Sequence, residues 1–383
     1  MRIIADENIP FVREAFAELG EVETFAGRAI SPDVVRNADI LLVRSVTKVN
    51  SELLEGSSVR FVATATIGTD HIDELYLQRR GIGFASAKGS NANSVAEYVF
   101  AALLNLAVRY NWKLAEKTLG VIGVGNIGSR VVRIAQGLGM EVLQNDPPLA
   151  RQTADPRFLP LEALMNADIL TLHVPLTYEG EDATYHLFDE AKFRQMQPAT
   201  VLFNTSRGAV VDNQALKGIL ATGQLAAVVL DVWENEPHID GELLRMVTIG
   251  TPHIAGYSLD GKVNGTRMIY EAVCNFLGVK PTWNPSGQLP PPKISEIRIN
   301  GNALRSDEEA LNTVVQQAYP IEKDDARLRA MLKIPPEQWG TYFDSLRKNY
   351  PVRREFFNIK VRVNNYSSSL IKKLKVLGFM AEE

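Results

Sequence analysis

The stretch LGVIGVGNIG, residues 119–128, decides the fold class of this chain. Its apolar residues predict a buried strand, and Gly123, Gly125 and Gly128 follow in the order that joins a parallel strand to a helix. The first glycine turns the chain, the second lets the backbone approach a ligand, and the third lets the helix pack close to the sheet. The residues that follow support this strand–turn–helix prediction, because residues 127–138 have helical character and residues 141–145 predict the next strand.

An acidic residue after that second strand indicates what the turn would bind. Asp146 lies 18 residues after Gly128, where a carboxylate can accept both ribose hydroxyls of an adenosine. Phosphates would then lie on the amides at the start of the helix. These features predict NAD as the cofactor, and they disfavour NADP because the carboxylate would repel a 2′-phosphate. Taken alone, the glycines also fit a purely structural turn between strand and helix.

Composition limits the classes of partner. The chain has 383 residues, 41 basic and 45 acidic, with a net charge of −4. That length suffices for two or three domains, and the charge provides no basic field for nucleic acid or a membrane, so neither partner is expected. An anionic substrate would need local cations.

The single cysteine, Cys274, predicts a buried structural thiol, and the first residues lack the apolar core of a signal peptide, so a cytoplasmic location is expected.

Short apolar strands alternate with amphipathic helices along the chain, which is typical of doubly wound parallel sheets. More than a hundred residues precede the glycine turn, so the earlier strands predict a separate α/β domain, and residues 93–111 predict a long helix between the two. A helix over 262–277 is expected to pack back on the first domain, and the proline-rich stretch 281–293 predicts a linker. The expected strands are residues 3–5, 40–43, 61–65, 121–122, 142–143, 169–172, 201–203 and 228–230.

The expected fold is therefore α/β, with two doubly wound parallel-sheet, Rossmann-like domains facing a cleft and a small α+β C-terminal domain. Residues 1–93 and 257–282 would form a discontinuous substrate-binding domain. Residues 94–256 would form the NAD-binding Rossmann domain, and residues 283–383 the C-terminal domain.

Segments after the glycine turn carry the residues that hydride transfer from an alcohol requires, namely a base and a cation. VLFNTSRGAVVD places Arg207 beyond a buried strand, at the edge where open α/β sheets bind ligands. There a guanidinium can form two bonds to a carboxylate, although an arginine that braces the next helix is the alternative. TIGTPHIAGY places His253 in a similar loop. VVLDVWENEP offers Asp231, Glu234 and Glu236 as carboxylates that could orient an imidazole, whereas a lone histidine is more often structural.

The ordered motifs GVGNIG, NTSRGAVVD, DVWENEP and TPHIAG resemble the D-2-hydroxyacid dehydrogenase family. ATATIGTDHID and KGSNANSVAEYVF resemble the substrate domain and the connecting helix of that family. Within it, MRIIADENIP, RSVTKVN, HIAGYSLDGKVNGT and the C-terminal extension are most similar to members that oxidise 4-phospho-D-erythronate. The resemblance implies oxidation of that acid to 2-oxo-3-hydroxy-4-phosphobutanoate with NAD, in pyridoxal 5′-phosphate (vitamin B6) biosynthesis.

The resemblance also implies roles for individual residues and a homodimer formed through the C-terminal domain. Neutral His253 would accept the hydroxyl proton, Glu236 would stabilise the imidazolium, and Arg207 would hold the carboxylate. Arg44 or Lys88 could supply positive potential for a phosphate. No metal is expected. The implied catalytic residues are Arg207, Glu236 and His253; the cofactor-binding residues are Gly123, Gly125, Asn126, Ile127, Gly128, Asp146, Ser206, Arg207, Gly208, Asp231 and Gly256; and the substrate-binding residues are Ser45, Thr66 and Tyr257.

Two alternatives stay open. One is another acid dehydrogenase of the same family, such as one that acts on 3-phosphoglycerate, with the same fold and the same base. The other is a non-catalytic protein that senses nucleotides, which the set Arg207, Glu236 and His253 disfavours because a sensor needs no base.

Overall fold

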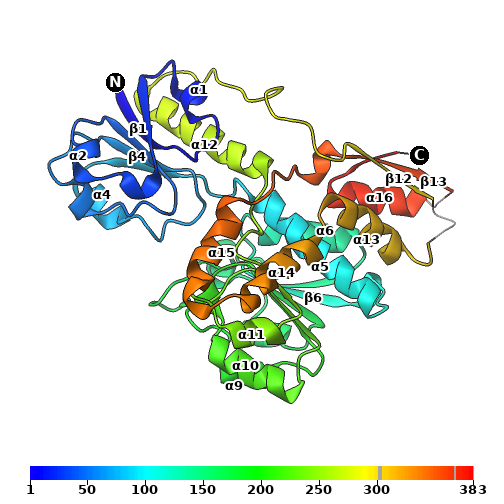
Figure 1. Cartoon of the computed structure of the whole chain (residues 1–383). Helices are drawn as coiled ribbons and strands as arrows, with labels where there is room; N and C mark the ends of the chain where they lie inside the picture. Colours follow the sequence, from blue (N-terminus) through cyan, green and yellow to red (C-terminus); the bar gives the residue numbers. More distant parts are fainter. Residues whose placement is uncertain (301–303, 366–367, 383) are drawn as a thin grey trace. The chain divides into compact units, whose positions relative to one another are not determined.

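The computed structural model describes residues 1–300, 304–365 and 368–382. The chain divides into two compact units. The first consists of residues 1–91 and 258–290, and the second of residues 92–257 and 291–383 (Figure 1).

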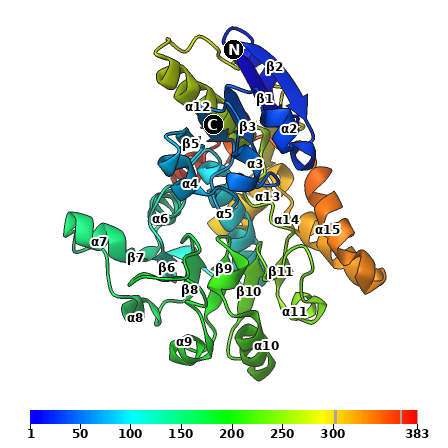
Figure 2. The same cartoon turned by 90° about the vertical axis from the view of Figure 1, so that its left-hand side faces the viewer.

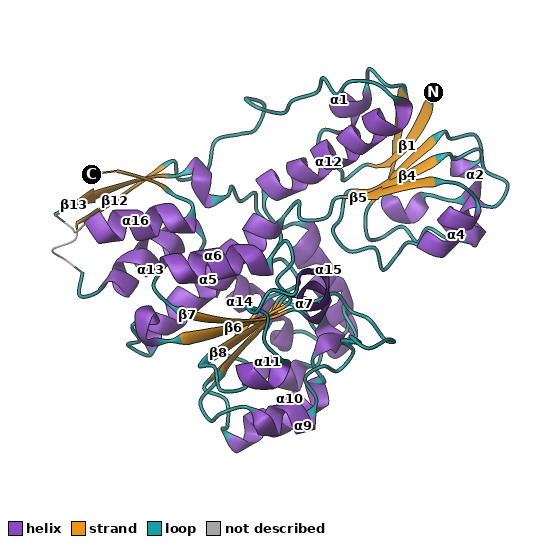
Figure 3. Cartoon of the chain, turned by 180° about the vertical axis from the view of Figure 1, so that it is seen from behind, coloured by secondary structure: helices purple, strands orange, loops and turns teal. Residues whose placement is uncertain are grey.

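The first unit is built on a five-stranded parallel sheet with the order β2-β1-β3-β4-β5. Side chains alternate between its faces, so that Ile3 and Leu42 pack with residues of α1 and α12, whereas Ile4 and Leu41 pack with residues of α2, α3 and α4. Helices α1 and α12 cover one face of this sheet, and α2 and α4 lie on the other (Figure 3). The elements are β1 (Arg2–Asp6), α1 (Val12–Phe16), β2 (Glu21–Phe25), α2 (Pro32–Val35), β3 (Ile40–Val43), α3 (Ser51–Leu54), β4 (Phe61–Thr64), α4 (Glu74–Arg79), β5 (Gly83–Ser86) and α12 (Leu259–Leu277).

The second unit contains a six-stranded parallel sheet with the order β11-β10-β9-β8-β6-β7. Helices α5 and α6 cover one face and α8 to α11 the other, with a separate apolar core on each side (Figure 2). The elements are α5 (Ala92–Arg109), β6 (Thr118–Ile122), α6 (Gly128–Gly137), β7 (Glu141–Asn145), α7 (Pro147–Thr153), α8 (Leu161–Leu164), β8 (Ile169–Leu172), α9 (Glu190–Gln195), β9 (Val201–Asn204), α10 (Asn213–Thr222), β10 (Ala227–Leu230), α11 (Gly241–Met246) and β11 (Ile249–Gly250).

The C-terminal stretch forms a small parallel sheet of its own, with the order β12-β13-β14, but belongs to the second unit. Ile297 and Val361 of this sheet share one continuous core with α5 and α6, and α13 packs along α5 (Figure 1). Asp325 of α14 accepts a hydrogen bond from the amide of Gly250 in β11 at 2.7 Å. The elements are β12 (Glu296–Asn300), α13 (Asp307–Ala318), α14 (Ile321–Arg329), α15 (Trp339–Lys348), β13 (Lys360–Asn364), α16 (Ser368–Leu377) and β14 (Met380–Glu382).

The strands of the six-stranded sheet end at one level. Ile122 pairs with Asn145 and with Leu172, Leu172 pairs with Asn204, and Leu230 pairs with both Asn204 and Gly250. The loops that follow these strands therefore gather along one edge. The strand order reverses at β6, which has β7 on one side and β8 on the other, and ligands bind at such a switch point in open α/β sheets.

The predicted fold class is confirmed, and the predicted strands 40–43 and 169–172 coincide with β3 and β8. The predicted strand 61–65 ends one residue earlier, at Thr64. Strands β2 and β5 were not predicted, because they are the edge strands of the first sheet and are only partly buried, so EVETF and GFAS lack an apolar run. Within the described ranges, no helix combines the length and the apolarity that a membrane crossing would need.

Candidate active site

The glycine turn has the close packing that its spacing predicts. Gly123 has φ of 85°, and a Cβ on this residue would lie 2.7 Å from the carbonyl oxygen of His173. A Cβ on Gly128 would lie 2.0 Å from the carbonyl oxygen of Gly123, so only glycine lets α6 start this close to β6. A Cβ on Gly125 would meet no atom within 4 Å, so this glycine borders open space.

The open side of the turn fits an anionic group. Within residues 1–300, 304–365 and 368–382, the amides of Gly125, Asn126 and Ile127 donate no hydrogen bond. Three such donors at the start of a helix favour a phosphate. Asp146 follows β7 and accepts bonds from the amides of Val124 at 2.8 Å and Leu149 at 3.0 Å, which fixes its carboxylate beside the turn. These residues fit the diphosphate and the ribose of a dinucleotide.

Arg207 lies in the loop after β9. Its Nη1 donates to the carbonyl oxygen of Ser206 at 2.8 Å, and the side chain of Asn204 donates to the Arg207 carbonyl oxygen at 2.9 Å and accepts from the Ser206 amide at 3.0 Å. A Cβ on Gly208 would lie 2.0 Å from the carbonyl carbon of Trp233. The Arg207 loop therefore packs directly against the loop that carries Glu236.

Asp231 fixes the loop that carries His253. Its side chain is 1% exposed and accepts hydrogen bonds from the Thr251 hydroxyl at 2.6 Å and from the amides of Ile254 and Ala255 at 2.7 and 2.9 Å. The carbonyl oxygen of Asp231 also accepts from the His253 amide at 2.7 Å. Burial raises the pKa of Asp231, while the nearby His253 and these hydrogen bonds oppose that effect. The structure thus gives this predicted cofactor residue a bracing role.

His253 and Glu236 form a hydrogen-bonded pair. Nδ1 of His253 donates to Oε2 of Glu236 at 2.7 Å, and Oε1 of Glu236 accepts from the Trp233 amide at 2.9 Å. Burial alone would raise the pKa of Glu236, but the charge and the hydrogen bond of His253, together with the hydrogen bond from the Trp233 amide, lower that pKa. In the described residues, Nε2 of His253 has no hydrogen-bond partner, and the side chain is one-third exposed. His253 also has φ of 57°, a strained conformation that is concentrated at functional sites.

Glu234, an alternative carboxylate in the sequence, pairs with a different histidine. Its Oε1 lies 2.7 Å from Nε2 of His186, and Nδ1 of His186 lies 3.7 Å from Asp212. Potential ligand atoms of these three residues lie within 4.8 Å of one another. The other oxygen of Glu234 accepts from the Asn213 amide at 2.9 Å, and Asp212 caps α10, so each carboxylate has a structural role.

His173 is a further imidazole at the same sheet edge, after β8. Its two ring nitrogens lie 2.9 Å from the hydroxyl of Thr171 and 3.2 Å from the hydroxyl of Thr205. Burial lowers the pKa of His173 to about 3, so this ring is neutral at physiological pH. Its only sequence signal is its place at a strand end.

The first unit carries the predicted substrate residues Ser45, after β3, and Thr66, after the adjacent β4. The hydroxyl of Thr66 donates to the carbonyl oxygen of Gly68 at 3.0 Å and lies 2.7 Å from the Thr64 hydroxyl. Lys262 of α12 is a cation that the sequence did not single out. Burial, and then the charge of Arg44, lower the pKa of Lys262 to about 8. Arg44 therefore lies near a second cation, Lys262. Lys88, the other cation that the sequence offered for a phosphate, is exposed.

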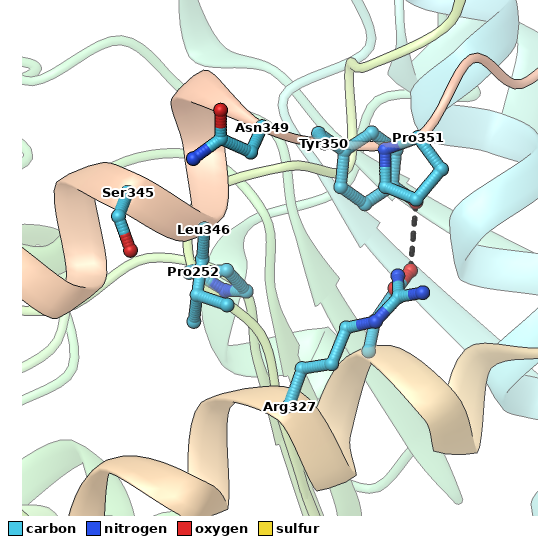
Figure 4. Close-up of a pocket in the computed structure, with 8 residues that line it drawn as sticks. Pro252, Arg327, Ser345, Leu346, Asn349, Tyr350 and Pro351 are labelled. Carbon is cyan, nitrogen blue, oxygen red and sulfur yellow. Dashed lines mark hydrogen bonds and ion pairs between the residues drawn. The ribbon is translucent and has the colours of Figure 1, made fainter.

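Tyr257, the third predicted substrate residue, belongs to the second unit and follows His253 by four residues. C-terminal helices reach this loop. A pocket of about 280 Å³ is lined by Pro252, by Asp324 and Arg327 of α14, and by residues around the end of α15 that include Tyr350 (Figure 4). The Tyr350 hydroxyl donates to Asp324 at 2.7 Å across this pocket. No sequence motif had connected the C-terminal stretch with the histidine loop.

Two family models match different parts of the chain. Residues 101–255 match the NAD binding domain of the D-isomer specific 2-hydroxyacid dehydrogenases. Residues 288–378 match a domain of unknown function (DUF3410). The first match contains the glycine turn, Arg207, Glu236 and His253, and the second contains α13 to α16.

Similar proteins cover the whole chain. The erythronate-4-phosphate dehydrogenase of Cronobacter sakazakii is 46% identical over 382 residues, covering 100% of this chain and 98% of its own. The enzyme of the same name from Marinobacter nauticus is 44% identical, covering 99% of both chains.

Among solved structures, the D-lactate dehydrogenase of Aquifex aeolicus, complexed with NAD and lactic acid, has a TM-score of 0.60 and 26% identity and covers 73% of this chain and 96% of its own. The TT0316 protein of Thermus thermophilus has a TM-score of 0.61 and 29% identity, with 73% and 98% covered. Fold, cofactor domain and full-length identity agree: this chain belongs to the erythronate-4-phosphate dehydrogenases, within the NAD-dependent D-2-hydroxyacid dehydrogenase family.

Proposed function

We propose that this chain oxidises 4-phospho-D-erythronate to 2-oxo-3-hydroxy-4-phosphobutanoate, with NAD as the hydride acceptor, in pyridoxal 5′-phosphate biosynthesis. The observation that carries the chemistry is the pair of Glu236 and His253, in which one ring nitrogen is bonded to a carboxylate and the other has no partner within the described chain. That arrangement is a general base of the kind that alcohol oxidation needs. The names of the full-length relatives support the substrate.

In this mechanism, Nε2 of His253 accepts the proton of the C2 hydroxyl as the C2–H bond breaks. Glu236 stabilises the imidazolium that forms, because the carboxylate favours the charged ring. Arg207 binds the substrate carboxylate and polarises the C2 oxygen through its guanidinium. NAD, held by the residues named below, would supply the hydride acceptor. The alcohol would then lose one proton to His253 and one hydride from C2, and a ketone would remain.

The cofactor would be held by the glycine turn and by loops along the same sheet edge. The open amides of Gly125, Asn126 and Ile127 support a site for the diphosphate, and Asp146 supports a site for the ribose. Ser206, Arg207, Gly208, Asp231 and Gly256 complete the proposed set.

The substrate would contact Ser45, Thr66 and Tyr257. The neighbouring cations Arg44 and Lys262 support the binding of a phosphate by the first unit, because an anion between two like charges relieves their repulsion. We also propose that the enzyme works in the cytoplasm as a homodimer, formed through residues 283–383.

Turnover of matched substrates tests the proposal. NADH absorbance is followed while 4-phospho-D-erythronate, 3-phosphoglycerate or D-lactate is added to the protein and NAD. The expected kcat/KM is highest for 4-phospho-D-erythronate. Equal or better turnover of 3-phosphoglycerate would contradict the substrate assignment, and no NADH formation with any 2-hydroxy acid would contradict the enzymatic function.

A further inference from the structure

Thr251 connects helix α5 with the loop that carries His253. Its hydroxyl donates to Oδ1 of Asp231 at 2.6 Å and lies 2.7 Å from the hydroxyl of Tyr98, a residue of α5. Tyr98 and Thr251 are completely buried, and Asp231 is nearly so. A hydroxyl carries one hydrogen, and Thr251 gives its hydrogen to the carboxylate, so Tyr98 donates to Thr251. We call Tyr98, Thr251 and Asp231, bonded in this order, the hydroxyl chain.

The ionisation of its two end groups agrees with this direction of the hydroxyl chain. Burial, and then the charge of Asp231, raise the pKa of Tyr98 well above its ordinary value, so the phenol keeps the proton that it donates. Both side-chain oxygens of Asp231 accept hydrogen bonds from backbone amides, as an ionised carboxylate does. The hydroxyl chain therefore runs from a phenol donor to a carboxylate acceptor.

The carboxylate end of the hydroxyl chain fixes the backbone on both sides of His253. Oδ1 of Asp231 accepts from the Ile254 amide at 2.7 Å and Oδ2 from the Ala255 amide at 2.9 Å, both after the histidine. Thr251, which bonds the same Oδ1, precedes the histidine by two residues. His253 lies between them with φ of 57°, and such a conformation persists only where the surrounding structure holds it. The place of the imidazole therefore depends on the hydroxyl chain.

The C-terminal part of the unit holds the turn of α5 that carries Tyr98. Glu97, the preceding residue, is buried and forms an ion pair with the buried Arg353. The ring of Tyr98 itself lies beside the ring of Tyr319, with 6.3 Å between the centroids. Both contacts come from residues 288–378, which match a domain of unknown function. The C-terminal residues thus support the hydroxyl chain at its phenol end.

We propose that Tyr98 is a positioning residue of the dehydrogenase reaction, which acts through Thr251 and Asp231 to hold the His253 imidazole in the orientation that proton transfer needs. The inference rests on the proposed function and deepens it. A general base must lie within hydrogen-bond reach of the proton that it accepts, so a small displacement of the ring lowers kcat. Arg207, which would bind the substrate carboxylate, is outside the hydroxyl chain, so KM for the substrate should change much less than kcat.

Removal of single hydroxyls tests the hydroxyl chain. Tyr98→Phe should lower kcat by about three- to tenfold and leave KM for 4-phospho-D-erythronate within about twofold, because one hydrogen bond is lost. Thr251→Val removes both hydrogen bonds of the hydroxyl chain and should lower kcat by about 10- to 100-fold. Thr251→Ser keeps the hydroxyl, so it should retain kcat within about threefold of the wild type.

The effects of the first two substitutions should not add. In Thr251→Val the Tyr98 hydroxyl has already lost its partner in the hydroxyl chain. The double variant Tyr98→Phe/Thr251→Val should therefore have the kcat of Thr251→Val alone, whereas additive losses would overturn the inference.

Two buried hydroxyls outside the proposed site provide matched controls. The Tyr270 hydroxyl accepts a hydrogen bond from the Thr282 amide at 2.9 Å, and the Thr200 hydroxyl donates to the Gln197 carbonyl oxygen at 2.9 Å. Tyr270→Phe and Thr200→Val should lower the stability of the protein but leave kcat within about twofold of the wild type. Equal losses of kcat in Tyr98→Phe and Tyr270→Phe would show a general effect of stability and would overturn the inference.

Amide hydrogen exchange of the peptide that contains residues 251–257 reports on this loop without substrate or cofactor. Tyr98→Phe and Thr251→Val should speed the exchange, and the two controls should not.

A wild-type kcat in Tyr98→Phe would overturn the inference, and so would wild-type exchange in Thr251→Val or a kcat in Thr251→Ser as low as in Thr251→Val. Failure of the wild type to oxidise 4-phospho-D-erythronate would instead count against the proposed function, and the exchange would still report on the hydroxyl chain.

Discussion

Two histidine–carboxylate pairs in the second unit have the same hydrogen-bond length and different surroundings. His253 with Glu236 and His186 with Glu234 are both joined at 2.7 Å. In the second pair the other ring nitrogen faces Asp212 at 3.7 Å, so His186 lies between two carboxylates. His253 instead keeps one nitrogen without a partner in the described residues. A base that exchanges protons with substrate needs such a nitrogen, so the second contact of each ring, and not the first, distinguishes the two pairs.

The largest expected difference between the pairs is the effect of removing each ring. His253→Ala should lower kcat by about 10²- to 10⁴-fold, because a general base contributes an effect of this size. His186→Ala should leave kcat within about threefold of the wild type, because it removes only a peripheral interaction. Steady-state NADH formation measures both, and comparable losses in the two variants would contradict the distinction.

The carboxylates should differ in the same direction. Glu236→Gln should lower kcat by about 10- to 100-fold, since a hydrogen bond to a charged partner is lost where the imidazolium forms. Glu234→Gln is the matched control and should stay within about threefold. If Glu234→Gln were the more damaging change, the proposed assignment of the orienting carboxylate would be wrong.

The two pairs also differ in how their loops are held in place. The buried carboxylate of Asp231 accepts hydrogen bonds from the amides of the His253 loop. Asp231→Asn should lower the free energy of unfolding by about 2 kcal/mol, since an amide cannot accept all the bonds from Thr251, Ile254 and Ala255. Asp212→Asn, at the other histidine, changes a helix cap and should cost no more than about 1 kcal/mol. Urea denaturation with circular dichroism measures both; a larger loss for Asp212→Asn would contradict this ranking.

The smallest expected effect is the acid dependence of stability. The pKa of Glu236 in the folded protein lies below its ordinary value of 4.5, so its ionisation stabilises the fold above that pH. This contribution disappears as pH falls through the folded pKa. The difference in unfolding free energy between wild type and Glu236→Gln should therefore shrink below pH of about 4.5, by at most about 1.4 kcal/mol per unit of pKa shift. A difference that grows with acidity would contradict the lowered pKa.

The glycine turn, the part of the site that is formed by backbone atoms, was predictable from local sequence. Gly123 and Gly128 are required because neighbouring backbone leaves no room for a Cβ, and a requirement of this kind appears directly in a short motif. The alternation of apolar strands with helices likewise predicted the inner strands of both large sheets. The edge strands β2 and β5 were missed because their residues are partly exposed, and the edge strand β11 was missed because it has only two residues.

For the part of the site that is formed by side chains, the sequence predicted the candidate residues but not all of their contacts. Asp231, Glu234 and Glu236 are three acids within six residues, and which of them bonds His253 depends on how two loops pack at the sheet edge. Lys262 and Tyr350 gave no signal, because each becomes a neighbour of a candidate site residue only through helix packing. Long-range contacts of this kind leave no spacing pattern in one sequence.

The pH dependence of kcat/KM for 4-phospho-D-erythronate, compared between wild type and Glu236→Gln, tests the central claim most directly. An isolated imidazole titrates near a pH of about 6.5, and a paired carboxylate favours its protonated form. Removing the Glu236 charge should therefore move the inflection to lower pH, while Glu234→Gln leaves it in place. An inflection that stays in place in Glu236→Gln would contradict the account that this carboxylate tunes the base.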